Sequence, residues 1–162
     1  MENLKKQIIK LLTEDARYTY LQMSKMLGEK EEIIEKAVKE LEDDGIIVKY
    51  SAIINAEALN DEKVQALVEV KVALQRNAFD KYAEEICSFS EVTGLYLMSG
   101  GFDLAVFVEG KSITDIARFI SEKLSVIDGI VSVQTQFILK RFKIEGQNTR
   151  PSGKGDRQVI QA

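Results

Sequence analysis

The sequence predicts an α+β protein with an all-helical first part and an α/β second part. Two spacings of apolar residues along the 162-residue chain support this prediction. From residue 4 to residue 41, apolar residues recur mostly three and four positions apart, which is typical of amphipathic helices. From residue 64 onward, extended segments with a period of two alternate with further helical segments. A chain of this length can form two small domains, each with a modest core.

The first part contains three predicted helices and a strand. The helices cover residues 4–12, 20–27 and 33–41. Gly28 and Gly45 follow the second and third helices, where glycine suits the left-handed backbone that often ends a helix. Residues 46–54 are rich in β-branched side chains and predict a strand. A very short turn between the second and third helices then predicts a winged helix-turn-helix over residues 1–54; a plain three-helix bundle that binds nothing is the alternative.

The second part predicts a ferredoxin-like domain over residues 64–143. Residues 55–63 are polar and predict a linker or a short connecting helix. The predicted elements that follow are strand 64–74, turn 75–77, helix 79–87, strands 92–98 and 104–108, helix 113–124, turn 128–129 and strand 130–142. This β-α-β-β-α-β order places both helices on one face of an antiparallel sheet. Because the other face is left partly apolar, we expect it to pack against a second copy.

The last residues differ in composition from the rest of the chain. Residues 144–162 combine glycine, proline and polar side chains, which predicts a flexible basic tail. Residues 140–162 hold six bases and two acids, a net charge of +4, although the whole chain carries −4. Two hypotheses follow, namely that the tail contacts DNA or that it only aids solubility.

Composition narrows the class of function. The chain lacks histidine, which excludes a Cys-His dyad, a Ser-His-Asp triad and the commonest metal ligand. The single cysteine, Cys87, is predicted on the apolar face of a helix as a small buried side chain. With no signal-peptide pattern and no apolar run of roughly 20 residues, we expect a cytoplasmic protein without a membrane span. We predict no cofactor, no metal and no enzymatic activity; an acyl-phosphate hydrolase of this fold would need more than the Arg76-Asn77 pair, because no glycine-rich phosphate loop accompanies it.

Four segments, taken in order and with their spacing, resemble a known family. They are Leu-Leu-Thr-Glu-Asp-Ala-Arg at 11–17, Leu-Glu-Asp-Asp-Gly-Ile-Ile-Val-Lys-Tyr at 41–50, Ser-Gly-Gly-Phe-Asp at 99–103 and Ile-Asp-Gly-Ile at 127–130. Over about residues 3–143 the chain resembles the Lrp/AsnC family of leucine-responsive, or feast/famine, regulators. The resemblance implies a transcriptional regulator that binds double-stranded DNA and forms homodimers, often assembled into octamers. It also implies a RAM-type second domain that senses a small effector, commonly an amino acid.

The resemblance places the effector site in the glycine loop between two strands. The candidate residues are Met98, Ser99, Gly100, Gly101, Phe102 and Asp103. Two successive glycines let backbone N–H groups approach a ligand carboxylate closely, and an aspartate can hold an ammonium group. The alternative is a glycine turn that Asp103 caps.

The predicted DNA-reading helix is unusually acidic. Residues 29–44 contain eight acids and three bases, a net charge of −5. Glu32 and Glu35 stand four residues before Lys36 and Lys39, a spacing that predicts helix ion pairs worth roughly 0.2–0.5 kcal/mol each. The acids repel phosphates, although a glutamate can accept a hydrogen bond from cytosine. The candidate DNA-binding residues are Lys5, Lys6, Arg17, Thr19, Tyr20, Lys30, Glu31, Glu32, Lys36, Lys39, Lys49 and Tyr50.

Two functions are consistent with this charge pattern. The first is a regulator whose DNA binding is weak per dimer and steeply salt-dependent. The second is a small-molecule-binding or assembly protein whose helix-turn-helix has lost DNA binding. The charge of residues 29–44 favours the second function, and the family resemblance favours the first.

Overall fold

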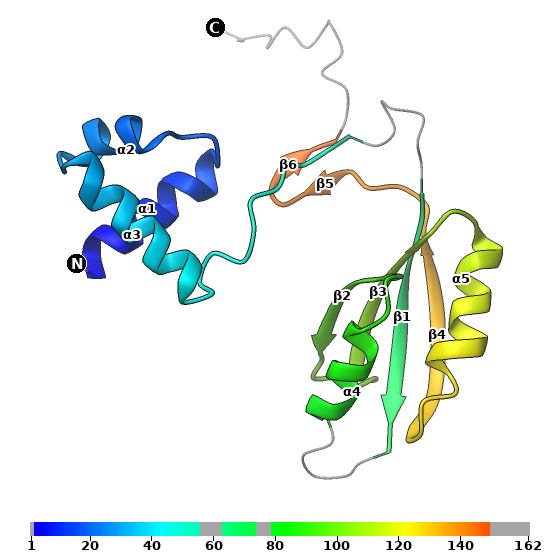
Figure 1. The fold of residues 1–162 in the computed structure, drawn as a ribbon. Coiled ribbons are helices and arrows are strands. Elements are labelled where there is room, and N and C mark those ends of the chain that lie inside the picture. Colours follow the sequence, from blue (N-terminus) through cyan, green and yellow to red (C-terminus); the bar gives the residue numbers. More distant parts are fainter. Residues whose placement is uncertain (1, 56–62, 74–78, 150–162) are drawn as a thin grey trace, which may run out of the picture. The chain divides into compact units, whose positions relative to one another are not determined.

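A computed structural model describes residues 2–55, 63–73 and 79–149 (Figure 1). The chain divides into two compact units, Met1–Ile53 and Ile54–Ala162. The predicted turn 75–77 lies outside the described residues, as do most of the predicted linker and the last part of the predicted tail. Among the described residues, no helix has the length and apolar character needed to cross a membrane.

Unit 1 contains the three predicted helices. They are α1 (Glu2–Glu14), α2 (Tyr20–Leu27) and α3 (Glu31–Asp43). A capping box starts α2: the Thr19 hydroxyl accepts from the Gln22 amide at 3.2 Å, and the Gln22 side chain accepts from the Thr19 amide at 2.9 Å. Gly28 and Gly45 have φ angles of 70° and 67°, so both predicted glycine stops are confirmed. The apolar faces form one core with the buried members Ile8, Met23, Ile34, Ala37, Val38 and Leu41.

The strand predicted over residues 46–54 is not formed. The Ile46 and Ile47 amides donate to the Leu41 carbonyl at 2.9 and 3.0 Å and so close the end of α3. No described segment pairs with residues 46–54, and Val48 is 88% exposed. A strand exists only where a neighbour completes its hydrogen bonds, so β-branched composition alone does not create one. In the single chain the wing strand was therefore a wrong prediction.

Unit 2 is built on one antiparallel sheet with the strand order β2-β3-β1-β4 (Figure 1). Its elements are β1 (Val64–Val72), α4 (Phe79–Cys87), β2 (Val92–Leu97), β3 (Leu104–Gly110), α5 (Ile113–Phe119) and β4 (Ile130–Ile138). Val68 in the middle of β1 lies opposite Val106 of β3 and Thr135 of β4. This element order and sheet are consistent with the predicted ferredoxin-like domain.

The core of unit 2 lies between the sheet and its helices. Alternate residues of β1 point into it, since the side chains of a strand alternate between the two faces. Tyr82 of α4 packs there, close to the turn before β4. Gly129 in that turn has a φ of 90°, and a Cβ at this position would lie 2.0 Å from the Tyr82 hydroxyl oxygen. Glycine is therefore required at 129 both by the backbone and by the space available.

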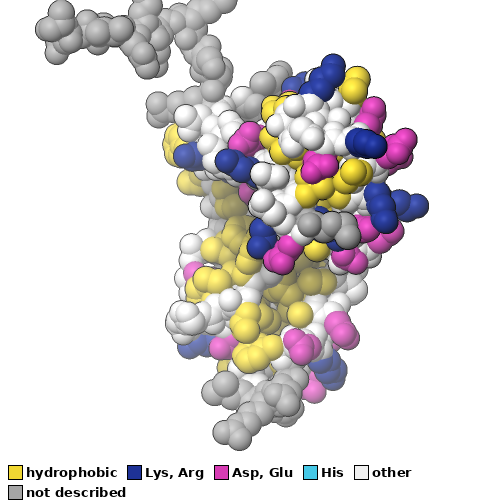
Figure 2. All heavy atoms as spheres, turned by 90° about the vertical axis from the view of Figure 1, so that its left-hand side faces the viewer, with side chains coloured by type: hydrophobic (Ala, Val, Ile, Leu, Met, Phe, Trp, Pro, Cys, Tyr) yellow, Lys and Arg dark blue, Asp and Glu magenta, His cyan; other side chains and the backbone are white. Residues whose placement is uncertain are grey.

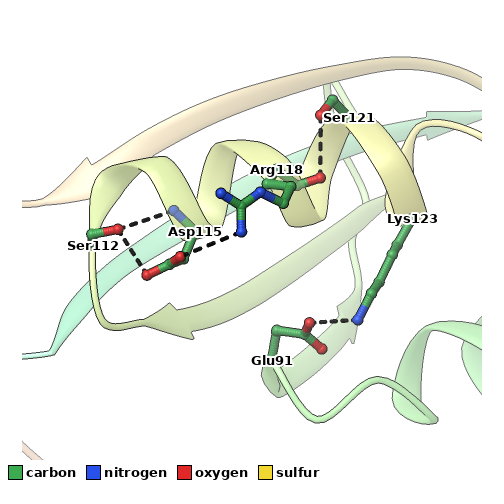
Figure 3. A network of polar contacts seen from close by, with 6 residues as sticks. All are labelled: Glu91, Ser112, Asp115, Arg118, Ser121 and Lys123. Carbon is green, nitrogen blue, oxygen red and sulfur yellow. Dashed lines mark hydrogen bonds and ion pairs between the residues drawn. The ribbon is translucent and has the colours of Figure 1, made fainter.

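The second predicted helix of unit 2 is present, but it changes from an α-helix to a π-helix in its last turn. Its last turn, η2 (Ile120–Leu124), is a π-helix that ends where the Ser125 amide donates to the Ile120 carbonyl at 2.8 Å. Ser112 caps the start of α5 by accepting from the Asp115 amide at 3.1 Å (Figure 3). At the other end, the Lys123 ammonium lies 2.6 Å from Glu91, which ties η2 to the segment before β2 (Figure 3).

Cys87 is exposed rather than buried, contrary to the prediction. The buried face of α4 is set by Tyr82 and Ile86, which lie four residues apart. Cys87 follows Ile86 by one residue, a rotation of about 100° around the helix, so it leaves the apolar face.

The sheet face opposite the helices carries mixed side chains. Phe107 of β3 meets Tyr96 of β2 edge to face, with ring centroids 5.7 Å apart, and lies opposite Leu67 of β1. The Gln136 amide donates to the Glu69 carboxylate at 2.6 Å across β4 and β1. Tyr96 remains 58% exposed, so this face offers apolar surface to a partner. Figure 2 shows hydrophobic side chains gathered on one face of unit 2.

The residues after β4 do not begin a flexible tail at residue 144. β4 ends at Ile138, earlier than the predicted residue 142, because the sheet pairing stops there. β5 (Lys143–Ile144) and β6 (Gln147–Asn148) then form a small hairpin. Its turn, Glu145-Gly146, has φ angles of 44° and 81°, which are both left-handed. The tail prediction is wrong for residues 144–149, and residues 150–162 lie outside the described residues.

Hydrogen bonds of Thr149 join the residues after β4 to the beginning of unit 2. The Asn55 side-chain amide donates to the Thr149 carbonyl at 2.9 Å. The Thr149 hydroxyl donates to the Arg141 carbonyl. These bonds hold the hairpin beside the chain segment that leads into β1.

Candidate functional site

The outer face of α3 presents the charged side chains that the sequence predicted for DNA. Glu31, Glu32, Lys36 and Lys39 are all exposed, whereas the core residues of α3 point the other way. Lys30 occupies the N-cap position, and its side chain makes no capping hydrogen bond. Four of the predicted contact residues on α3 are therefore accessible to a ligand from solvent.

The two predicted ion pairs along α3 are not formed. Within the described residues, neither Lys36 nor Lys39 lies within 4.0 Å of a carboxylate oxygen, so the pairs with Glu32 and Glu35 are absent. Exposed pairs of this kind gain little energy and cost side-chain entropy. Both ammonium groups are thus available to phosphates.

Lys5 serves the packing of unit 1 instead. Its ammonium nitrogen lies 3.0 Å from Glu40 and 3.6 Å from Asp44, and the side chain is 25% exposed. The hydrogen bond from Lys5, together with its positive charge, lowers the pKa of the Glu40 carboxyl. Because Lys5 ties α1 to the end of α3, the structure does not support it as a phosphate ligand.

Arg17 and Lys6 are engaged more weakly. The Arg17 guanidinium donates two hydrogen bonds to Asp15, at 2.9 and 3.0 Å, and these bonds lower the pKa of Asp15 to about 2. The Lys6 ammonium lies 3.0 Å from Glu2. Both cationic side chains are mostly exposed, and exposed pairs of this kind are easily exchanged for a phosphate.

Three further predicted residues line one cavity of unit 1. Thr19, Tyr20 and Tyr50 border a space of about 390 Å³ beside Glu42. The Tyr50 hydroxyl donates to the Glu42 carboxylate at 2.9 Å. Burial first, and then this hydrogen bond, raise the pKa of Tyr50 to about 12. The neighbouring Lys49 is exposed and lies outside this cavity lining.

The loop of residues 98–103 joins β2 to β3 and is held at both ends. The Met98 amide donates to the Asp103 carbonyl at 2.8 Å, and the Asp103 amide donates to the Val70 carbonyl at 3.0 Å. The Asp103 carboxylate accepts from the Val72 amide at 2.9 Å. Asp103 therefore caps the end of β1 rather than its own loop. One carboxylate oxygen has this bond, and the side chain is only partly buried.

Neither Gly100 nor Gly101 is required by the fold of the single chain. Their φ angles are not left-handed, and a Cβ on either residue would meet nothing within 4 Å. Ser99 beside them is exposed, and Phe102 is half-buried. The space above the two glycines is thus open to a ligand or to another copy of the chain.

Sequence reasoning missed the partners that fix this loop. Val70 and Val72 hold Asp103 through their backbone groups, about 30 residues away along the chain. Backbone groups carry no residue-type signal, so only the pairing register of β1 and β3 could have identified them.

Comparison with known proteins identifies the family. Residues 65–147 match the Lrp/AsnC ligand binding domain. Over 156 residues the chain is 38% identical to the uncharacterized HTH-type transcriptional regulator YugG of Bacillus subtilis strain 168, covering 95% of this chain and 93% of that protein. The chain belongs to the Lrp/AsnC family. The match to YugG spans both units, so the likeness is not limited to the ligand-binding domain.

One further relative supports membership of the Lrp/AsnC family, and one solved structure shares the fold. HTH-type transcriptional regulator LrpA of Pyrococcus abyssi is 34% identical over 139 residues, which cover 85% of this chain and 96% of that protein. A transcriptional regulator of Neisseria meningitidis, solved as a complex with L-Met, has a TM-score of 0.69 at 23% identity. That match covers 89% of this chain and 93% of the other, and at this identity it shows the fold. Both YugG and LrpA are described as HTH-type transcriptional regulators.

Proposed function

We propose that α2 and α3 form a helix-turn-helix that binds double-stranded DNA, and that an amino acid bound at residues 98–103 tunes DNA affinity and oligomeric state. The observation that carries the DNA part is the free outer face of α3. Lys36 and Lys39 are exposed there, and neither forms an ion pair within 4.0 Å among the described residues. The turn between the helices is only residues 28–30, which is typical of this motif.

The phosphate contacts come from exposed cationic side chains around α3. Lys6, Arg17 and Lys49 are exposed in addition to the lysines of α3. Thr19 and Tyr20 are exposed at the start of α2, where the positive end of the helix dipole favours a phosphate, although the capping box already uses the Thr19 and Gln22 amides. The acids of the first turn of α3 offer acceptors for cytosine, but they repel phosphates. Binding is therefore weak for each helix-turn-helix and falls steeply with salt.

The effector part is supported by the loop geometry and by a structural neighbour. The open space over Gly100 and Gly101 lets backbone amides reach a carboxylate. Asp103 is fixed nearby by the Val72 amide and supplies the opposite charge for an ammonium group. The Neisseria meningitidis protein of the same fold was solved with an amino acid, L-Met.

A homodimer, and an octamer built from it, accounts for two surfaces that the single chain leaves uncovered. Residues 46–54 have no strand partner among the described residues, and five of their large hydrophobic side chains are more than 45% exposed. The sheet face that carries Tyr96 and Phe107 is also open. Both surfaces are candidates for contact with a second copy.

The DNA part is tested by fluorescence anisotropy with a duplex from the protein's own promoter region. The double variant Lys36→Gln/Lys39→Gln is compared with Lys10→Gln, which changes an exposed lysine of α1 outside the proposed contact set. We expect the double variant to bind more weakly and to lower the slope of log affinity against log salt by about 2. If the slope of log affinity against log salt does not change, α3 does not contact the DNA phosphates.

The alternative, an assembly or small-molecule-binding protein without DNA binding, is favoured by the net charge of −5 over residues 29–44. The same assay separates the two functions. If the wild-type protein binds no duplex at about 50 mM salt, where phosphate contacts are strong, the alternative holds.

A further inference from the structure

A second cavity in unit 2 has a lining that the amino-acid site does not explain. It measures about 470 Å³ and lies where the end of β4, the start of β1 and the hairpin of residues 143–149 meet. Its volume falls within the usual range for small-molecule sites. No residue of the 98–103 loop is among the described residues that line it. The two sites are therefore distinct.

The lining combines positive charge with apolar side chains. Lys63, Lys140 and Arg141 contribute to it, and no Asp or Glu is among its described residues. The lining is therefore positively charged, although the whole chain has a net charge of −4. The apolar part of the lining includes Phe137 and Leu139, which are 37% and 94% exposed. Such a surface is complementary to an anion that has an apolar body.

Two of the three cations are already engaged. The Lys63 ammonium lies 2.6 Å from Glu109, and the Lys140 ammonium lies 5.9 Å from the centroid of the Phe142 ring. Both lysines therefore have partners next to the cavity that they line.

Arg141 is different. Its side chain is partly buried, and its guanidinium makes no hydrogen bond or ion pair with any described residue. Its effect on the Glu109 carboxyl, whose pKa is lowered mainly by Lys63, is electrostatic only. Its backbone is fixed, since its carbonyl accepts from the Thr149 hydroxyl. An arginine side chain on a partly buried residue, whose donors have no partner among the described residues, fits a carboxylate, which matches its planar fork.

We propose that this cavity binds a small organic carboxylate with an apolar body and no ammonium group, such as a 2-oxo acid, through the Arg141 guanidinium. An amino acid would bring an ammonium group into a lining without a described carboxylate, whereas the loop site offers Asp103 for that group. The two sites thus separate amino acids from carboxylates of the same shape. The proposed carboxylate site does not depend on the function proposed above, whereas the separation of amino acids from carboxylates rests on it.

A ligand in the cavity would contact the first residues of unit 2. Ile54 and Asn55 belong to its lining, and Ile54 directly follows unit 1 in the chain. The Asn55 amide is bonded to the Thr149 carbonyl, so a ligand against the hairpin also contacts the segment that connects the units.

The test is isothermal titration calorimetry of the full chain with phenylpyruvate and with phenylalanine. These probes share the ring and the carboxylate and differ at the keto and ammonium groups. Three variants are compared with the wild type: Arg141→Gln, Asp103→Asn and the control Arg118→Gln, which changes a mostly exposed arginine of α5 outside the lining. Leu139→Asp adds a negative charge at a position that is 94% exposed, so it tests the cavity without disturbing a core.

We expect phenylpyruvate to bind the wild type, Asp103→Asn and Arg118→Gln alike. Arg141→Gln and Leu139→Asp should weaken it at least about tenfold, the effect of removing a charge-assisted contact. Phenylalanine binding should not respond to Arg141→Gln. The proposal is overturned if phenylpyruvate does not bind, as when a second copy or the chain's own last residues fill the cavity. It is also overturned if Asp103→Asn abolishes phenylpyruvate binding, or if Arg141→Gln weakens both probes equally.

Discussion

Asp103 gives the sharpest test, because its structural role and its proposed ligand role respond to different substitutions. Its carboxylate accepts one hydrogen bond, from the amide of Val72, which is 6% exposed. Asp103→Ala removes this acceptor and leaves a buried amide unsatisfied, at a cost of about 1–3 kcal/mol. Asp103→Asn keeps an acceptor oxygen and removes only the charge, so we expect it to cost less than about 1 kcal/mol.

The ligand role predicts that both substitutions weaken ligand binding to a similar extent. Loss of the charge opposite an ammonium group should weaken binding of L-methionine by about 1.5–3 kcal/mol, roughly 10- to 150-fold, in both variants. Urea unfolding followed by circular dichroism measures the stability, and isothermal titration calorimetry measures the binding. If Asp103→Asn binds L-methionine as tightly as the wild type does, Asp103 is a structural cap and the proposed ammonium contact is refuted. If Asp103→Asn destabilises as much as Asp103→Ala, the bond to Val72 has been assigned wrongly.

Two further predictions concern the fold. Gly129→Ala should destabilise unit 2 by about 2–5 kcal/mol in urea unfolding, since it adds left-handed strain and overlap with Tyr82. Tyr82→Phe should recover part of that loss in the double variant, and purely additive effects would show that the overlap is relieved in another way. Asp15 has a folded-state pKa of about 2, below its ordinary 3.8, so its pair with Arg17 stabilises unit 1 above about pH 4 and is lost as the pH falls toward 2. Thermal melts from pH 5 to pH 2 should therefore fall more steeply for the wild type than for Asp15→Asn, and parallel curves would contradict the assignment.

The apolar period and the glycines were sufficient to predict most of the elements. The three helices of unit 1 and the β-α-β-β-α-β order of unit 2 appear where the spacing placed them, with ends shifted by a few residues. Gly28 and Gly45 have the left-handed conformation expected after a helix. These features are local: a period of 3.6 or 2 and a helix stop are properties of neighbouring residues.

Pairing between distant segments could not be predicted in the same way. Residues 46–54 have strand composition but no strand neighbour, and residues 143–149 form a hairpin in a segment whose composition predicted a tail. Cys87 missed the buried face of α4 by one position. For residues 46–54 and 143–149 the outcome depends on which other part of the chain supplies hydrogen bonds, whereas Cys87 leaves the buried face through the rotation of the helix itself.

The same distinction between local and long-range information applies to the candidate sites. The sequence by itself determined the loop 98–103 and the acidic character of α3, because both are written in consecutive residue types. Only the tertiary structure showed that Lys5 is held by Glu40, that neither Lys36 nor Lys39 forms an ion pair within 4.0 Å among the described residues, and that Asp103 is fixed by Val72. It alone placed Arg141 beside a cavity. The physical reason is that a charged side chain takes its partner from whatever folding brings within a few ångströms, and the sequence records only its neighbours along the chain.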